Sequence, residues 1–251
     1  MRILLVNDDG YTKDGILRLE EALSERGHEI WVVSPSSNRS AQSHAMSLSG
    51  PIVMTRYGEN HYHCSGSPTD CILYAIKGEI FPALPDLVIS GINHGYNCSS
   101  DILYSGTCSA ASEAVLQGVR AMAVSAQADE EGRYDFASVA GFVADNMDAL
   151  YSLTGGRSFV NLNFPPHFRR EVVPAALGLL YYGDRPRVIS DDGHELVLRM
   201  EEGEVSRTLT RYGGESDLDV CRSGRIALSV VMVNPALDEE AHRRAGTLDF
   251  K

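Results

Sequence analysis

The sequence predicts an α/β fold, namely a doubly wound, mostly parallel sheet in a three-layer, Rossmann-like arrangement, with a C-terminal β-hairpin extension. Two observations predict it. In the first part of the chain, short continuous apolar runs alternate with segments of helical periodicity, as expected of parallel strands buried on both faces. After Pro165, β-like runs are separated by turns rich in Gly and Asp, without a convincing amphipathic helix between them.

The elements expected before Pro165 follow one another at the spacing of strand–helix–strand units. The helix over 15–27 has one apolar stripe and a Gly27 stop. The helix over 67–80 opens with Ser67 as N-cap, followed three residues later by Asp70, a pattern similar to a capping box. The other expected elements are strands over 2–6, 28–35, 86–91, 120–127 and 158–165 and helices over 107–118 and 136–150.

The β-like runs of the second part cover 176–183, 194–201, 205–213 and 225–235. Their alternating pattern predicts hairpins, which form either an antiparallel extension of the sheet or an arm. We therefore expect a single domain over 1–251, made of a Rossmann-like core over 1–165 and a hairpin-rich segment over 166–251. Exposed hairpins leave edge strands that need a partner, so this segment is expected to serve oligomerisation.

Composition excludes several classes of protein. The formal net charge of −12 argues against extended contact with a nucleic-acid duplex, which needs several Lys or Arg side chains on one face. The five cysteines are odd in number, scattered and without a C-x-x-C pair, so neither a disulfide framework nor a zinc site is indicated. No apolar run is long enough for a signal peptide or a membrane span. We expect a soluble cytoplasmic protein that does not bind membranes.

Two adjacent aspartates, Asp8 and Asp9, follow the first apolar run, and Gly10 comes directly after them. Gly10 permits a turn that brings both carboxylates to one side. At about 4 Å, two like charges cost roughly 1 kcal/mol in water and about 4 kcal/mol at an effective dielectric of 20. A divalent cation would convert this repulsion into binding energy. Alternatively, this stretch is an ordinary turn in which an aspartate caps the next helix, and the four residues leave both interpretations open.

Two further loops add neutral oxygen atoms at the carboxyl ends of strands, where open parallel sheets bind ligands. Carboxylates together with neutral oxygens favour a hard cation such as Mg²⁺ or Mn²⁺, and no thiolate or paired imidazole is offered for zinc. His44, His61, His63 and His94 are expected at the surface or beside ligands rather than as ligands. The oxygen donors of the two loops are Ser34, Ser36, Ser37, Asn38 and Ser40 in one and Asn93, Asn97, Ser99 and Ser100 in the other.

A Ser-Gly-Thr turn that runs into a helix of small residues, at 105–107, is the candidate phosphate site. Free N–H groups and hydroxyls lie there at the positive end of a helix dipole. Simple N-capping by Ser105 or Thr107 is the alternative. The sequence contains no Walker A motif and no G-x-G-x-x-G after the first strand, which removes the main support for a P-loop hydrolase or a dinucleotide-dependent redox enzyme.

In order along the chain, these segments resemble the SurE survival-protein family of metal-dependent nucleotide phosphatases. The resemblance rests on "ILLVNDDG", "NRSAQSHAMSL", "SGSPTDC", "DLVISGINHGYN", "ILYSGTCSAASEA" and "FVNLNFP", and "GESDLDVCRSGRIALSVV" is similar to the family's final Thr-Asp and strand motif. Three positions depart from the family pattern: Cys108 and Ser112 stand where larger apolar residues are expected, and Ser216 replaces a threonine.

The resemblance implies roles for individual residues. It implies that one divalent ion per subunit, Mg²⁺ or Mn²⁺, is held by Asp8, Asp9, Ser40 and Asn93. It implies phosphate contacts by Asn97, Ser105, Gly106 and Thr107. Asp8 and Asp9 would also be the catalytic residues. Only the resemblance selects Ser40 within its serine-rich loop.

The resemblance implies hydrolysis of nucleoside 5′- and 3′-monophosphates, with short polyphosphate as a further substrate, by a homodimer or homotetramer. A haloacid-dehalogenase-type phosphatase also begins with aspartates after a first strand, but it needs Asp-x-Asp, which adjacent aspartates do not provide. A non-catalytic nucleotide-binding stress protein is the alternative from another class. It would tolerate loss of the metal ligands, yet all four positions carry residues able to bind a metal.

Overall fold

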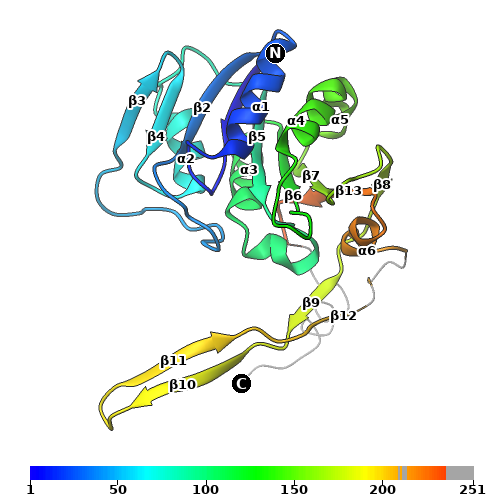
Figure 1. Cartoon of the computed structure of the whole chain (residues 1–251). Helices are drawn as coiled ribbons and strands as arrows, with labels where there is room; N and C mark the ends of the chain where they lie inside the picture. Colours follow the sequence, from blue (N-terminus) through cyan, green and yellow to red (C-terminus); the bar gives the residue numbers. More distant parts are fainter. Residues whose placement is uncertain (209, 211–213, 236–251) are drawn as a thin grey trace, which may run out of the picture.

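A nine-stranded sheet with helices on both faces forms the body of the protein (Figure 1). The computed structural model describes residues 1–208, 210 and 214–235. In space the strands run in the order β3-β4-β2-β1-β5-β6-β7-β13-β8. Their bounds are β1 Arg2–Val6, β2 Glu29–Pro35, β3 Met54–Gly58, β4 His61–Cys64, β5 Leu87–His94, β6 Ala121–Ala126, β7 Ser158–Phe164, β8 Val172–Pro174 and β13 Ile226–Met232.

The centre of the sheet is parallel, from β4 through β2, β1, β5 and β6 to β7. β3 lies antiparallel to β4 at one edge, and β13 lies antiparallel to β7 toward the other. In β1, Ile3 and Leu5 belong to the core on one face, and Leu4 and Val6 belong to the core on the other. Burial on both faces explains the continuous apolar runs, and the predicted doubly wound class is confirmed.

Helices form the two outer layers. α1 packs against α4 on one face of the sheet, and α2 packs against α3 on the other. The capping box at the start of α2 is present, with Asp70 N–H donating to Ser67 Oγ at 3.1 Å and Ser67 N–H donating to Asp70 at 2.9 Å. The helix bounds are α1 Asp14–Glu25, α2 Pro68–Lys77, α3 Gly106–Leu116, α4 Phe136–Asp145, α5 Met147–Leu153 and α6 Asp217–Arg222, with a 3₁₀ helix, η1, at Ser99–Leu103.

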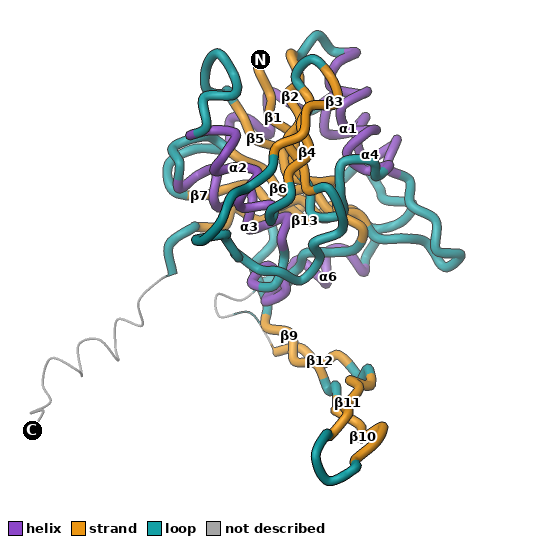
Figure 2. Tube along the Cα trace, turned by 90° about the vertical axis from the view of Figure 1, so that its left-hand side faces the viewer, coloured by secondary structure: helices purple, strands orange, loops and turns teal. Residues whose placement is uncertain are grey.

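An arm of two strand pairs projects from the body (Figures 1 and 2). β9, Leu179–Tyr182, pairs antiparallel with β12, Val205–Thr208, at the base of the arm. β10, Arg185–Asp191, pairs antiparallel with β11, Leu196–Glu201, farther out. A sheet extension and an arm were the two predicted alternatives for the second part of the chain, and both occur. β13 and β8 extend the sheet, while β9 to β12 form an arm. Residues 209, 211–213 and 236–251 of the predicted 166–251 segment lie outside the described residues.

Four expectations about elements were incomplete or wrong. The helix expected over 136–150 is two helices, which separate at Asn146, where the side-chain amide donates to Phe142 O at 2.8 Å. A short helix, α6, does occur after Pro165, and six residues are too few to show a periodicity. β5 continues past Gly91 to His94, and the edge strand β3 and its neighbour β4 were not predicted.

All five cysteines are buried and free, as expected of a chain without a disulfide framework. No helix in the described part of the chain has both the length and the apolar character to span a bilayer.

Candidate functional site

The turn after β1 is built by Asn7 and Gly10, so it makes no use of either aspartate side chain. The Asn7 amide donates to Gly10 O at 2.9 Å, and Gly10 N–H donates to Asn7 Oδ1 at 3.1 Å. Gly10 has φ +113°, a value that side chains rarely allow. Neither aspartate caps α1, because its N-cap is Lys13. The turn-and-cap interpretation therefore leaves Asp8 and Asp9 unexplained.

Asp8 is a buried carboxyl held by the start of α3. Only 4% of the residue is exposed, and Thr107 Oγ1 donates to Asp8 Oδ1 at 2.6 Å. Burial raises the pKa of Asp8 to about 6; the hydrogen bond from Thr107 opposes this rise, and the neighbouring charge of Asp9 adds to it. Hydrogen bonds therefore compensate the ionised form of Asp8 only in part, which is the situation that a bound cation would relieve.

Asp9 pairs with a histidine from the end of β5. His94 Nδ1 lies 2.9 Å from Asp9 Oδ2. The His94 ring also meets Tyr134 and Phe136 edge to face, with ring centroids 4.9 and 4.8 Å away. His94 therefore lies beside Asp9, a predicted metal ligand, and these aromatic rings fix its orientation.

The loop after β2 is tied to the aspartates through its backbone. Arg39 N–H donates to Asp8 O at 2.7 Å, which places Ser40 next to the first turn. The Ser40 N–H and Oγ both lie within hydrogen-bond distance of Asn38 Oδ1, at 2.7 and 2.6 Å. Ser40 is thus held in place by Asn38 rather than by contacts of its own with the core.

The two asparagines of the β5 segment have different supports. The Asn93 amide nitrogen donates to Gly95 O at 3.0 Å, a bond that does not use the side-chain oxygen. The backbone of Asn97 is clamped by β7, because its N–H donates to Asn163 Oδ1 at 2.8 Å and its carbonyl accepts from Asn161 Nδ2 at 2.8 Å. The Asn97 side chain donates to Ser125 Oγ at 2.8 Å. The motif "FVNLNFP" therefore positions Asn97 from a distant strand.

The start of α3 closes the site from the other side. Ser105 is the N-cap of α3, and its Oγ accepts from Cys108 N–H at 3.0 Å, as in the capping interpretation. At Gly106 a β-carbon would lie 2.8 Å from Asp8 Cβ and 2.9 Å from Asp8 Oδ2. Only glycine therefore lets the helix approach Asp8 this closely. In this structure, Thr107 directs its hydroxyl to Asp8, and its contact with phosphate remains a prediction.

A cavity of about 380 Å³ brings five of the eight predicted residues together. Three others, Asp9, Gly106 and Thr107, contact these residues or their neighbours without lining the cavity. The five that line it are Asp8, Ser40, Asn93, Asn97 and Ser105. Residues not predicted for this site also line it: Ala41, His94, Asp101, Tyr104, Tyr182 and Asp184. Tyr182 and Asp184 come from the arm, and no local motif marks them.

The donor set of this cavity suits a hard cation. Among the described residues that line it, none is Lys or Arg, so the carboxylates have no cationic side chain to neutralise them. In the described part of the chain, no group of three or more His, Cys, Asp or Glu side chains is placed to hold a metal. A cation here would thus depend on the neutral oxygens of Ser40 and Asn93 as well as on Asp8 and Asp9, which is the chemistry of Mg²⁺ or Mn²⁺ sites.

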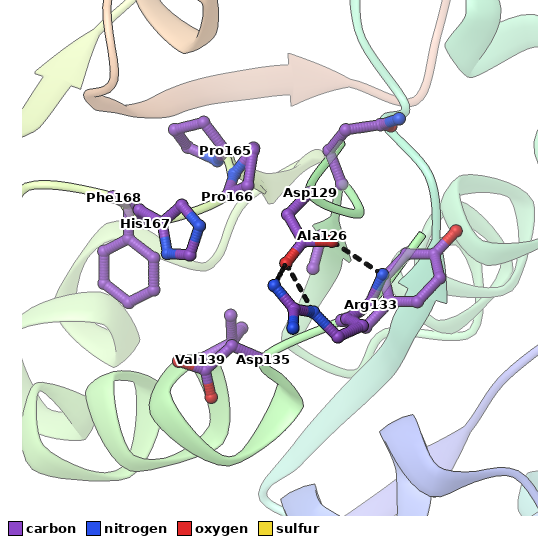
Figure 3. Close-up of a pocket in the computed structure, with 11 residues that line it drawn as sticks. Ala126, Asp129, Arg133, Asp135, Val139, Pro165, Pro166, His167 and Phe168 are labelled. Atoms are coloured by element: carbon purple, nitrogen blue, oxygen red, sulfur yellow. Dashed lines mark hydrogen bonds and ion pairs between the residues drawn. The ribbon is translucent and has the colours of Figure 1, made fainter. Parts of the chain in front are cut away.

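A second hollow, of about 250 Å³, lies past the ends of β6 and β7 (Figure 3). Arg133 pairs with Asp129 on one side of it, and His167 and Phe168 lie on the other. Tyr134 also lines this hollow, and its ring contacts the ring of His94, which lines the first cavity.

Comparison with known proteins decides the family. The family model described as survival protein SurE matches residues 3–180. The chain belongs to the SurE family. The 5′-nucleotidase SurE of Desulfitobacterium hafniense (strain DSM 10664 / DCB-2) is 43% identical over 169 residues, which are 66% of this chain and 65% of that protein. The 5′-nucleotidase SurE of Solidesulfovibrio magneticus is 41% identical over 181 residues, 70% of each chain.

A solved structure extends the similarity to the whole SurE chain. The crystal structure of the SurE protein from Aquifex aeolicus superposes with a TM-score of 0.79 at 25% identity, and the match covers 98% of this chain and 99% of that one. The sequence match to the Desulfitobacterium relative is shorter and spans 65% of that protein's length. The family and the fold predicted from the sequence are both confirmed.

Proposed function

We propose that this SurE-family chain is a divalent-metal-dependent phosphatase that hydrolyses nucleoside monophosphates to nucleoside and phosphate. The 5′-nucleotides are the expected principal substrates, with 3′-nucleotides and short polyphosphate as further ones. The observation that carries the proposal is the placement of Asp8, Ser40, Asn93, Asn97 and Ser105 around one cavity, with Asp9 held against its lining residue His94 and Thr107 held against Asp8. The names of the curated relatives, 5′-nucleotidases, support the same substrate class.

Asp8, Asp9, Ser40 and Asn93 would hold the metal ion, Mg²⁺ or Mn²⁺. When bound, such an ion neutralises phosphate charge and lowers the pKa of water, which supplies a nucleophile near neutral pH. Asp9 is oriented by His94, and Asp8 is oriented by Thr107, so the two carboxylates have little freedom to rotate. This preorganisation lowers the cost of gathering like charges before the substrate arrives.

The phosphate would lie between Asn97 and the first turn of α3. Asn97 is held by three side chains from β6 and β7, so its position is fixed without a ligand. The N–H groups at the start of α3, after Ser105, offer donors and the positive end of the helix dipole to the oxygens of the transferring group. Charge that develops on those oxygens in the transition state is stabilised by such fixed donors.

Phosphate release tests the proposal. Protein stripped with EDTA is incubated with a panel of nucleoside 5′- and 3′-monophosphates and polyphosphate, alone and with Mg²⁺ or Mn²⁺ restored. We expect release from the monophosphates only after the metal is restored. A folded protein that releases no phosphate from any member of the panel with either metal would leave the alternative, a non-catalytic nucleotide-binding protein.

We also infer that a second copy of this chain covers the arm. A two-stranded hairpin is marginally stable alone in water, yet β10 and β11 are exposed along their whole length. Val188 and Leu198 face each other across this hairpin and are 53% and 51% exposed. Burial against another subunit would give a homodimer or homotetramer. We place the protein in the cytoplasm, a reducing compartment that suits its five buried free thiols, without a membrane or duplex partner.

A further inference from the structure

Two tyrosines stand at the exposed end of the metal and phosphate cavity. Tyr104 and Tyr182 line the same cavity as Asp8 and Asn97. They are 60% and 47% exposed, whereas Asp8 and Asn97 are 4% and 6% exposed. The buried polar residues therefore form the floor of the cavity, and the two tyrosines lie at its mouth. Among the described aromatic contacts, neither ring packs on another aromatic ring.

The arm carries Tyr182 to the mouth through a regular set of contacts with η1. Gly178 N–H donates to Ser99 Oγ at 3.1 Å, and Leu180 N–H donates to Ser100 Oγ at 2.9 Å. The Tyr182 hydroxyl donates to Asp101 Oδ2 at 2.6 Å. Consecutive residues of η1 thus bind alternate residues of the arm, which is the period of a strand. This register fixes the Tyr182 ring relative to the cavity before any ligand binds.

Hydrogen bonds also hold the backbone of Tyr104 in place. Tyr104 N–H donates to Asp101 O at 3.0 Å, and Tyr104 O accepts from Ser43 N–H at 3.1 Å. Its next neighbour along the chain, Ser105, is the N-cap of α3. Tyr104 therefore belongs to the same turn that is expected to bind phosphate. A group that a short linker joins to that phosphate can reach the Tyr104 ring.

The charge at the mouth selects the kind of group that fits there. Asp101 and Asp184 line the mouth together with the two tyrosines, and no Lys or Arg occurs among the described lining residues. Additional phosphates or carboxylates would be repelled by these two aspartates. A flat, uncharged ring would instead stack on an aromatic face, an interaction that every nucleobase can make.

We propose that Tyr104 and Tyr182 form the stacking platform for the base of the nucleotide whose phosphate lies on the floor of the cavity. This assignment rests on the proposed phosphatase function and adds the residues that distinguish a nucleotide from other phosphate esters. The platform would accept any of the bases, because stacking uses the face of the base and not its hydrogen-bonding edge.

The test compares AMP with ribose 5-phosphate, which has the same sugar and phosphate but no base. The readout is kcat/KM for AMP divided by kcat/KM for ribose 5-phosphate, measured with saturating Mn²⁺. In the parent protein we expect this ratio to be well above one. Tyr104→Ala and Tyr182→Ala should each lower it about tenfold or more, mainly through a higher KM for AMP, as expected for loss of one stacking contact.

Two further variants separate stacking from structural effects. Tyr182→Phe keeps the ring and loses the hydrogen bond to Asp101, so the ratio should stay within about threefold of the parent value. Tyr57→Ala removes a 43% exposed tyrosine of β3 that does not line the cavity, and it should leave the ratio unchanged. A ratio near one in the parent protein, or a ratio unaffected by both alanine substitutions at the mouth, would overturn the platform.

Failure of the proposed function gives a different result. If neither AMP nor ribose 5-phosphate releases phosphate with any metal, the phosphatase assignment fails, and saturation-transfer NMR with adenosine then tests the platform directly. Binding of adenosine to the parent protein and to Tyr57→Ala, with loss of the signal in Tyr104→Ala and Tyr182→Ala, supports it. Absence of binding to the parent protein, or equal binding to all four proteins, contradicts it.

Discussion

The hydroxyl of Thr107 donates a 2.6 Å hydrogen bond to Asp8 Oδ1, and this contact joins the first turn of α3 to the carboxylate that follows β1. The two residues are 99 positions apart and both are buried. Gly106 lies so near the same carboxylate that a β-carbon there would be 2.9 Å from Asp8 Oδ2. The candidate metal and phosphate regions are therefore one rigid unit, in which a change at the start of α3 acts on Asp8.

Thr107→Val is expected to lower phosphate release about 10- to 100-fold and to reduce the free energy of unfolding by about 1–3 kcal/mol. It removes a hydrogen bond to a charged group without much change of volume. Thr69→Val is the matched control: Thr69 is also the second residue of a helix and fully buried, but its hydroxyl has no partner among the described residues. Thr69→Val should leave phosphate release unchanged. It should leave the free energy of unfolding within about 0.5 kcal/mol of the parent value or raise it. Equal effects of the two substitutions would contradict the role of Thr107.

Gly106→Ala should reduce turnover at least about tenfold and weaken Mn²⁺ binding, because the new β-carbon would lie 2.8 Å from Asp8 Cβ. Isothermal titration calorimetry and phosphate release measure the two effects. Gly141→Ala, in the interior of α4, has no atom within 4 Å of the new β-carbon. This control should stabilise the protein by about 0.5–1 kcal/mol through helix propensity and leave turnover intact. Unchanged Mn²⁺ affinity in Gly106→Ala would contradict the close approach.

The stability of metal-free protein should depend on pH through Asp8. Its folded-state pKa of about 6 lies above the ordinary value of 3.8, so the folded state holds the proton more tightly than the unfolded state does. The stability that this provides is fully present below about pH 4 and is lost as the pH rises through about 6. Relative to Asp8→Asn, the parent protein should lose roughly 2 kcal/mol of unfolding free energy between pH 4 and pH 7.

Urea unfolding of EDTA-treated parent protein and Asp8→Asn at both pH values measures this difference. The amide introduced by Asp8→Asn keeps an oxygen that accepts from Thr107, so the comparison isolates the ionisation. The other carboxyl groups are common to both proteins, so their contributions to the pH dependence of the unfolding free energy cancel in this comparison. A difference in unfolding free energy that is the same at pH 4 and pH 7 would show that Asp8 is not held protonated by its surroundings.

The oligomer is expected to depend on the outer hairpin of the arm. Val188→Asp combined with Leu198→Asp places two charges on a cross-strand pair that we expect another subunit to cover. Sedimentation velocity should show a dimer or tetramer for the parent protein and a smaller species for the double variant. Leu84→Asp, at a loop residue that is 56% exposed, is the control and should not change the assembly. A monomeric parent protein would contradict the inference about the arm.

The central part of the fold could be predicted because its signals are local. The continuous apolar run of β1 and the capping box of α2 each lie within a few residues of sequence. The edge strand β3, "MTRYG", and its neighbour β4, "HYHC", carry few apolar residues because they are not buried on both faces, so no run marks them. Helix α6 has six residues, which is less than two turns, and its amphipathic pattern is too short to recognise.

The candidate site was predictable where the chemistry lies at or just after the carboxyl end of a strand, as for Asp8 and Asp9 after β1 and Asn93 near the end of β5. The residues that hold and surround these groups were not predictable, because their contacts join positions that are far apart in the sequence. Asn161 reaches Asn97 across 64 positions, and Tyr182 reaches Asp101 across 81. Nothing in the neighbourhood of Tyr182 in the sequence indicates that the arm returns to the cavity. Only the register of β9 on η1 places it there.

The most direct test of the account is phosphate release from AMP by EDTA-stripped protein, titrated with Mn²⁺, for the parent chain and for Asp9→Asn. The account predicts no release without metal, saturable restoration in the parent protein, and no restoration in Asp9→Asn at any Mn²⁺ concentration at which it remains folded. Turnover by the stripped parent protein, or parent-like kcat in Asp9→Asn at saturating Mn²⁺, would contradict the claim that this oxygen cluster holds the catalytic metal.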